Sequence, residues 1–216
     1  MISPLLIPFV TALSYLALGW LSLQVSIPPD YVSLVFLPAG LALGTCLVYG
    51  PKVLPGIFLG ALSVQVLASQ QAGIEGGSWI LVISPLGAVT QAWVGSLLAK
   101  HWARCYPGPL DTAPKVLVLL LLIGPVSCLI NASVSVPTLW AFGVIPTQGL
   151  LFSWWAWWLG DAIGAVLCLP LVLVFFGQPA LQWQSRRWTV GVPLIMAMVM
   201  VGVGFFQIKS WETARQ

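Results

Sequence analysis

The chain has 216 residues, is 59% hydrophobic with a mean hydropathy of +1.00, and carries only 8 Lys and Arg and 5 Asp and Glu residues. A soluble domain carries about a quarter charged residues, so this composition excludes a soluble protein and predicts an all-α polytopic bundle of transmembrane helices. The net charge is +3, but the basic residues are scattered singly or in pairs. Nucleic acid is therefore excluded as a partner, because a phosphate-binding surface needs clustered basic residues.

Seven stretches are long and apolar enough to cross a bilayer, which takes about 20 residues. They lie near residues 4–24, 32–50, 53–71, 79–100, 115–142, 148–177 and 189–208. The first has no preceding basic region, so it is predicted to be a helix rather than a cleaved signal. The fifth and sixth are longer than needed and contain Pro125, Pro137 and Pro170, so we expect each to be tilted or broken. Division of the fifth stretch would give eight spans.

Basic residues in short loops indicate which side of the membrane is cytoplasmic. With seven spans the loop cations all fall on one side, and they are Lys52, Lys100, Arg104, Lys115, Arg186 and Arg187. We therefore expect a cytoplasmic N-terminus and an outward-facing C-terminal end, with Asp30 and Glu75 also outside. The eight-span alternative places Arg186 and Arg187 outside and fits this rule less well.

The chain divides into a transmembrane domain over residues 1–208 and a polar helical end over residues 209–216. The end is interpreted as the start of an outward-facing stalk that leads to a downstream region. A short solvated tail is the alternative.

Asp161 is the only ionisable residue predicted deep inside a span, and polar groups at that depth suggest a functional site. It can be kept there by protonation, by a hydrogen bond to Asn131 or Gln91, or by a wet cavity. Two interpretations follow: an interhelical hydrogen bond, or a ligand-binding or coupling group. Trp158 lies one turn earlier, where an aromatic wall beside a carboxylate suits an apolar or cationic ligand. Trp154, nearer the outer surface, also suits an aromatic interface belt.

Small residues recur four positions apart, a spacing that lets helix backbones approach closely. The glycines concerned are Gly40, Gly44, Gly56, Gly60, Gly160 and Gly164. The contact that they predict is either within one chain or between two.

No catalytic or metal-binding pattern is found in the sequence. The cysteines Cys46, Cys105, Cys128 and Cys168 form no C-x-x-C motif, and His101 is the only histidine. We therefore expect neither a cofactor nor a metal, and no enzyme activity in this chain.

Two segments carry a resemblance to a known family. An aromatic-x-P-x-G start, a short basic loop and a P-G-x-x-x-G stretch are followed later by W-x-G-D-x-x-G-x-x-x-x-x-P. The matching residues are Phe36, Pro38, Gly40, Lys52, Pro55, Gly56 and Gly60, then Trp158, Gly160, Asp161, Gly164 and Pro170. In order and spacing they resemble the bacterial membrane-associated sensor domain of the first MASE type, over roughly residues 5–208.

The resemblance implies a sensory input module in the bacterial inner membrane, fused to GGDEF or EAL cyclic-di-GMP enzymes or to histidine kinases. Eight helices and a cytoplasmic exit are usual in that family, whereas seven spans and an outward exit suit members with an inserted extracytoplasmic CHASE-type domain. We expect a homodimer in contact with membrane lipid, with an unidentified small-molecule ligand. Two alternatives remain: a small-solute transporter or the substrate-binding membrane subunit of an uptake system, and a bundle that only anchors its enzyme.

Overall fold

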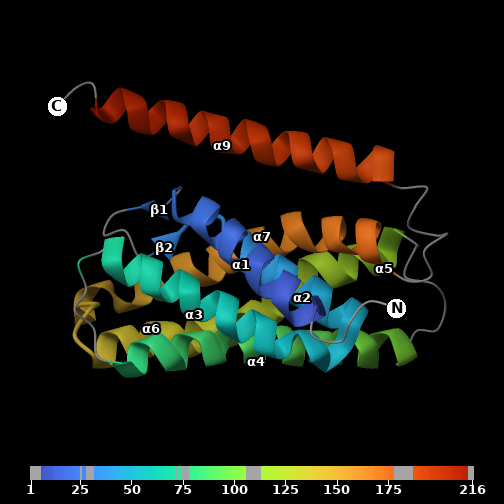
Figure 1. Ribbon diagram of the computed structural model, residues 1–216, viewed down its shortest axis with the longest axis horizontal. Helices are drawn as coiled ribbons and strands as arrows, with labels where there is room; N and C mark the ends of the chain where they lie inside the picture. The colour runs from blue at the N-terminus through green and yellow to red at the C-terminus, as the bar shows by residue number, and fades with distance from the viewer. Residues whose placement is uncertain are drawn as a thin grey trace.

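The computed structural model describes residues 6–24, 26–27, 32–71, 73, 78–105, 113–177 and 187–213 of the chain. Long helices lie side by side along one axis (Figure 1). Within the described part, six stretches are long and apolar enough to cross a membrane. The predicted all-α transmembrane bundle is therefore confirmed.

The first helix, α1 (Leu6–Leu23), leads into two short strands, β1 (Ser26–Ile27) and β2 (Val32–Ser33). These pair antiparallel, with Ser26 opposite Ser33. Helix α2 (Leu37–Tyr49) then begins with a proline in its first turn. The Oγ of Ser22 in α1 accepts the backbone N–H of Leu37 over 3.1 Å, so α1 supplies a partner for a group that a helix start leaves unpaired.

A short turn joins helices α2 and α3, which together make one continuous apolar stretch. Gly50 ends α2 with a φ of 72°, a backbone conformation that favours glycine. The turn continues through η1 (Gly50–Val53) into α3 (Leu54–Gln71). Phe36, just before α2, and Val64, in the second half of α3, line the same cavity, so the two helices run in opposite directions. This stretch thus accounts for the two spans expected at 32–50 and 53–71.

The middle of the chain forms three long helical paths. Helix α4 (Ser78–Cys105) is followed by α5 (Ala113–Val118), a π-helical turn η2 (Leu119–Ile123) and α6 (Gly124–Ala141). A 3-10 turn, η3 (Thr147–Gly149), then leads to α7 (Leu150–Phe176).

The prolines expected to break two of these paths are accommodated. Pro125 lies just after the π turn Leu119–Ile123 inside a continuous helical path, and the change of hydrogen-bond register at that turn accommodates its missing N–H. Pro137 lies inside α6 and Pro170 inside α7, which continues past it. The fifth stretch is therefore a single path with one π turn, and the division that would give eight spans is not found.

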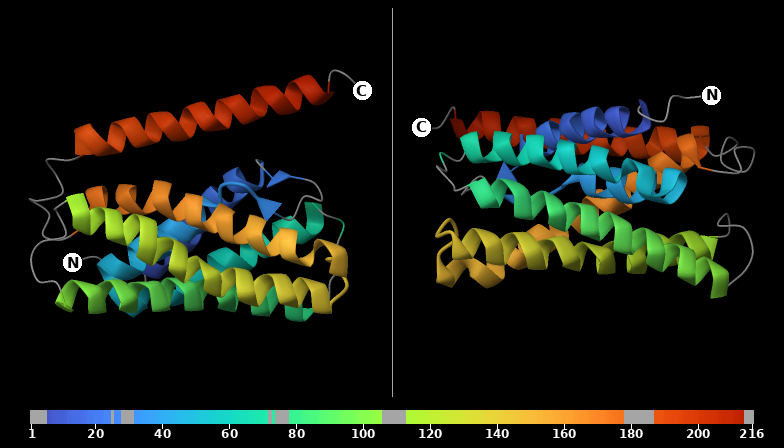
Figure 2. Two further views of the ribbon diagram at one scale, coloured as in Figure 1. Left: turned by 180° about the vertical axis from the view of Figure 1, so that it is seen from behind. Right: turned by 60° about the horizontal axis from the view of Figure 1, so that its bottom comes forward.

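The last helix, α9 (Val192–Thr213), follows the π turn η4 (Arg187–Gly191) and lies apart from the other helices (Figures 1 and 2). Arg187 joins η4 to the end of α7, since its Nη2 donates to the Phe175 carbonyl oxygen over 3.1 Å. Helix α9 includes most of the expected stalk, while residues 214–216 lie outside the described residues.

The connections that carry basic residues gather at one end of the bundle. The turn η1, the end of α4, the start of α5 and η4 all lie at the end where the N-terminus is drawn (Figure 1). Lys52, Lys100, Arg104 and Lys115 belong to these elements. Asp30, Glu75 and Arg186 lie outside the described residues.

Glycines set the close contacts between helices within this one chain. A Cβ on Gly40 would lie 2.6 Å from the Gly164 carbonyl oxygen, and one on Gly60 would lie 2.6 Å from the Tyr15 Cβ. A Cβ on Gly44 would meet Val172, and one on Gly56 would overlap the Pro8 backbone. Gly40 and Gly44 therefore mark a tight contact of α2 with α7, and Gly56 and Gly60 mark a tight contact of α3 with α1.

The buried core lies largely between α2, α7 and the helices around them. Cys46, Cys128 and Cys168 are free thiols in this interior. The side chain of Cys105 lies outside the described residues. The three described cysteines thus occupy buried positions, where a free cysteine packs as a small hydrophobic side chain.

Candidate functional site

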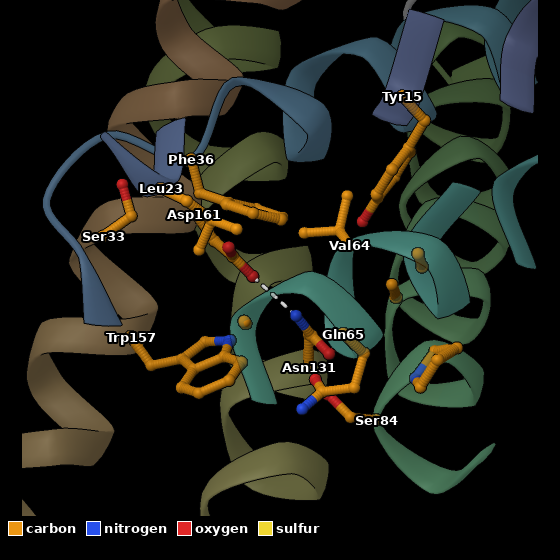
Figure 3. A pocket seen from close by; sticks show the side chains of 14 residues that line it. Tyr15, Leu23, Ser33, Phe36, Val64, Gln65, Ser84, Asn131, Trp157 and Asp161 are labelled. Carbon is orange, nitrogen blue, oxygen red and sulfur yellow. Dashed lines mark hydrogen bonds between the residues drawn. The ribbon is translucent and has the colours of Figure 1, made fainter. Parts of the chain in front are cut away.

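A cavity of about 60 Å³ lies inside the bundle, between α1, α3, α4, α6 and α7 and beside the segment that enters α2 (Figure 3). It is large enough for about four water molecules, since one needs at least ~10–15 Å³ by the same measure. Fourteen residues line it: Tyr15, Leu23, Ser33, Phe36, Ala61, Val64, Gln65, Ala68, Ser84, Pro85, Ala88, Asn131, Trp157 and Asp161.

Asp161 and Asn131 meet at the wall of this cavity. The Nδ2 of Asn131 in α6 donates to the Oδ2 of Asp161 in α7 over 2.9 Å. Asp161 is 1% exposed and Asn131 is 4% exposed. This pairing is one of those that the sequence suggested, and it ties α6 to α7.

The hydrogen bond extends into a chain that reaches α4. Ser135 donates from its Oγ to the Asn131 Oδ1 over 3.0 Å, and the Ser135 and Ser84 hydroxyls lie 2.8 Å apart. Because the single Ser135 proton is used toward Asn131, Ser84 must donate to Ser135. All three hydrogen bonds thus point the same way, from α4 through α6 to the carboxyl group of Asp161.

Polar atoms at the cavity remain without a partner. The Oδ1 of Asp161 makes no hydrogen bond with any described residue, and neither does the Tyr15 hydroxyl. Neither atom is sealed off from the cavity. Figure 3 shows the Tyr15 hydroxyl pointing inward, and Gln65 beside Asn131. The cavity therefore offers hydrogen-bonding groups to an occupant.

Aromatic side chains complete the wall. Tyr15 and Phe36 pack edge to face with ring centroids 6.2 Å apart. Trp157 closes the cavity from α7 (Figure 3). The site is thus apolar over much of its surface, with a few convergent polar groups, as is usual for small-ligand pockets.

The two sequence segments that carry the family resemblance contact each other directly. A Cβ on Gly160 would overlap the Ser33 carbonyl oxygen, and one on Gly164 would overlap that of Phe36. The Phe36 N–H also donates to the Gly160 carbonyl oxygen over 3.0 Å. The two glycines therefore let the backbone before α2 lie against α7, which sets the position of Phe36 beside Asp161.

The other predicted site residues lie elsewhere. Trp158 donates from its Nε1 to the Pro125 carbonyl oxygen over 2.8 Å, and Trp154 donates to the Ser133 Oγ over 3.1 Å. Gln91 donates to the Cys128 Sγ over 3.4 Å, and its Oε1 is buried with no partner among the described residues. These three residues link helices but do not line the cavity.

Several residues that line the cavity or belong to its hydrogen-bond chain were not among the predicted site residues. Trp157, rather than Trp158, supplies the aromatic wall beside Asp161. Ser127, Asn131 and Ser135 recur every four positions in α6, a polar stripe whose spacing was a usable signal for Ser135. Tyr15, a phenol deep in an apolar span, was another. Phe36 was identified as the aromatic residue of the aromatic-x-P-x-G start, although not as a site residue, and for Ser84 we find no comparable signal in the sequence.

The arrangement is suited to holding a small molecule rather than to transforming one. In the described part of the chain, no group of three or more His, Cys, Asp or Glu side chains is placed to hold a metal ion. The polar groups at the cavity are one carboxyl group, hydroxyls and amides.

The family model MASE1 matches residues 5–208, nearly the whole chain. No curated protein and no solved structure matches.

Proposed function

This chain belongs to the MASE1 family of membrane-associated sensory input domains of signalling proteins, and we propose that the cavity around Asp161 is where it detects its signal. Domains of this family are not catalytic themselves. The observation that carries the proposal is a cavity between the helices in which a carboxylate oxygen and a phenol hydroxyl have no partner among the described residues.

The lining helices explain how occupancy of the cavity is passed on. Residues of α1, α3, α4, α6 and α7 all contribute to the wall. A ligand that binds one packing of these helices better than another shifts the population toward that packing. Tight glycine contacts make the packing sensitive to small displacements, because closely packed backbones have little room to adjust.

The location, orientation and output that we propose for the domain are based on its family and on the distribution of its charged residues. The domain lies in the bacterial inner membrane as part of a homodimer, with the basic end of the bundle in the cytoplasm. The C-terminal end of this chain then faces outward. The output is cyclic-di-GMP turnover or histidine kinase activity in a downstream domain.

A cavity-filling substitution tests this proposal without knowledge of the ligand. Ala88 lines the cavity and is 8% exposed, so Ala88→Leu places three additional carbon atoms inside it. We expect the output of the complete gene product, measured as cellular cyclic-di-GMP or as kinase phosphorylation, to become fixed at one level. Ala197→Leu on the exposed side of α9 is the matched control.

Both variants are compared at equal abundance in the membrane, and Ala88→Val serves as a milder substitution if Ala88→Leu does not accumulate. An output that responds to growth conditions as in the wild type would contradict the proposal and favour a bundle that only anchors its enzyme. The transport alternative was based on broken helices and on a sparse polar interior, and the continuity of α7 removes support only from the first of these grounds.

A further inference from the structure

We propose that the cavity binds a small primary ammonium group, whose N–H bonds are accepted by the Oδ1 of Asp161. This inference rests on the proposed sensory role of the cavity and names the class of ligand that it takes.

The carboxyl group of Asp161 has no counter-charge among the residues that line the cavity. Asp161 is 1% exposed, and no Lys, Arg or His is among the residues that line the cavity. A buried carboxylate is costly unless it is paired and hydrogen-bonded. Asn131 supplies a hydrogen bond but no charge. A cationic occupant supplies both a charge and donors.

The hydrogen bonds around Asp161 all run toward its carboxyl group. The chain from Ser84 through Ser135 and Asn131 delivers its last donor to the Oδ2 of Asp161. The other oxygen, Oδ1, is left as an acceptor with no partner among the described residues. An ammonium group carries three donors and no acceptor, which matches this oxygen.

The wall of the cavity also favours a small cation in its shape and chemistry. Tyr15, Phe36 and Trp157 supply aromatic rings to the wall of the cavity that holds the carboxyl group (Figure 3), and aromatic rings attract cations. An anion would be repelled by the carboxylate, and no lining residue carries a basic side chain that would offset this repulsion. The volume of about 60 Å³ restricts the buried part of the ligand to a few non-hydrogen atoms.

The same ammonium chemistry has two sources, a free amine or the headgroup of phosphatidylethanolamine. The test therefore uses the protein in phosphatidylglycerol nanodiscs, with and without phosphatidylethanolamine. Propylammonium, 1-propanol and acetate are the probes, because each has four non-hydrogen atoms. Binding to the folded protein is measured as the concentration-dependent rise of the unfolding temperature, followed by circular dichroism at constant ionic strength.

We expect propylammonium to stabilise the protein and the other two probes to have little effect. Asp161→Asn keeps an acceptor for Asn131, and it should weaken propylammonium binding about tenfold or more, because hydrogen bonds to charged groups are the stronger ones. Trp157→Leu should also weaken binding, whereas Trp158→Leu removes a neighbouring indole that does not line the cavity and should not. The tryptophan pair keeps the test decisive if Asp161→Asn does not fold.

A preference for 1-propanol or acetate, no binding of propylammonium, or equal binding by Trp157→Leu and Trp158→Leu would overturn the assignment. If propylammonium binds, its competition with phosphatidylethanolamine identifies a lipid as the source, and lack of competition identifies a free amine. The failure of this assignment is separable from the failure of the proposed function, because the Ala88→Leu output experiment uses no ligand.

Discussion

Gly164 is where the fit between α7 and the start of α2 depends most on the absence of a side chain. A Cβ there would overlap the Phe36 carbonyl oxygen, which belongs to the backbone and cannot move aside cheaply. Inserting atoms into a packed interior typically costs about 1–3 kcal/mol. We expect Gly164→Ala to lower the free energy of unfolding by about this amount, measured by denaturation in detergent micelles.

Gly202 provides the matched control for this measurement. It lies in α9, and a Cβ added there meets nothing within 4 Å. Gly202→Ala should leave stability unchanged or raise it slightly, because alanine has the better helix propensity. Equal unfolding curves for the two variants would mean that α7 does not contact the α2 entry as described.

At the residue scale, the sequence predicted the pairing of Asn131 with Asp161 but not the other residues of the site. Asp161 and Asn131 were identifiable because polar side chains inside apolar spans are few and seek partners. The choice between Trp157 and Trp158 was not, since consecutive residues point about 100° apart on a helix. Which of the two indoles lines a cavity depends on the neighbouring helices, here on Pro125 accepting the Trp158 N–H.

At the scale of helices, hydropathy located most boundaries closely. The stretch expected at 148–177 is α7, Leu150–Phe176, and the stretch expected at 53–71 is α3, Leu54–Gln71. The π turn Leu119–Ile123 was not predicted, because a change of hydrogen-bond register leaves no mark in hydropathy. The prolines indicated breaks that the bundle accommodates inside α6 and α7.

The link between α6 and α7 is measurable as a coupling energy. The Asn131–Asp161 hydrogen bond joins the two helices over 2.9 Å. Interhelical hydrogen bonds in membrane proteins average about 0.6 kcal/mol and reach about 1.7 kcal/mol. We expect a double-mutant cycle of Asn131→Ala and Asp161→Ala, read from unfolding free energies, to give a favourable coupling within that range.

Ser63 supplies the control pair for this cycle. Its hydroxyl donates to the Leu59 carbonyl oxygen within its own helix, so Ser63→Ala and Asp161→Ala should be additive within about 0.5 kcal/mol. A cycle of Asn131 with Asp161 that is equally additive would show that the two side chains do not interact in the folded protein.

At the scale of the whole molecule, the bundle and its family were accessible from the sequence because composition and two short motifs carry them. The contact between those motifs was not, since nothing in either segment states that Ser33 and Phe36 lie against Gly160 and Gly164. A cavity is likewise a property of several helices together. No single segment encodes the space between Tyr15, Asn131 and Asp161.

The two ends of the bundle face opposite sides of the membrane in the orientation that we propose. Lys52 in η1 lies at the basic end of the bundle, whereas Gln148 in η3 lies in the turn between α6 and α7 at the opposite end (Figure 1). Positively charged loops stay in the cytoplasm. In intact spheroplasts, a membrane-impermeant maleimide should therefore label Gln148→Cys and leave Lys52→Cys unlabelled.

Inside-out vesicles should give the reverse labelling and control for reactivity, since Lys52 and Gln148 are both exposed. The natural thiols of Cys46, Cys128 and Cys168 are buried and add little background, while Cys105 is accounted for with the unsubstituted protein. Labelling of both sites from one side would contradict the alternating directions of the helices. Labelling of Lys52→Cys alone in spheroplasts would instead mean that the bundle is inverted in the membrane. That inversion would bring the carboxyl group of Asp161 nearer to the cytoplasmic face, within reach of a cytoplasmic amine.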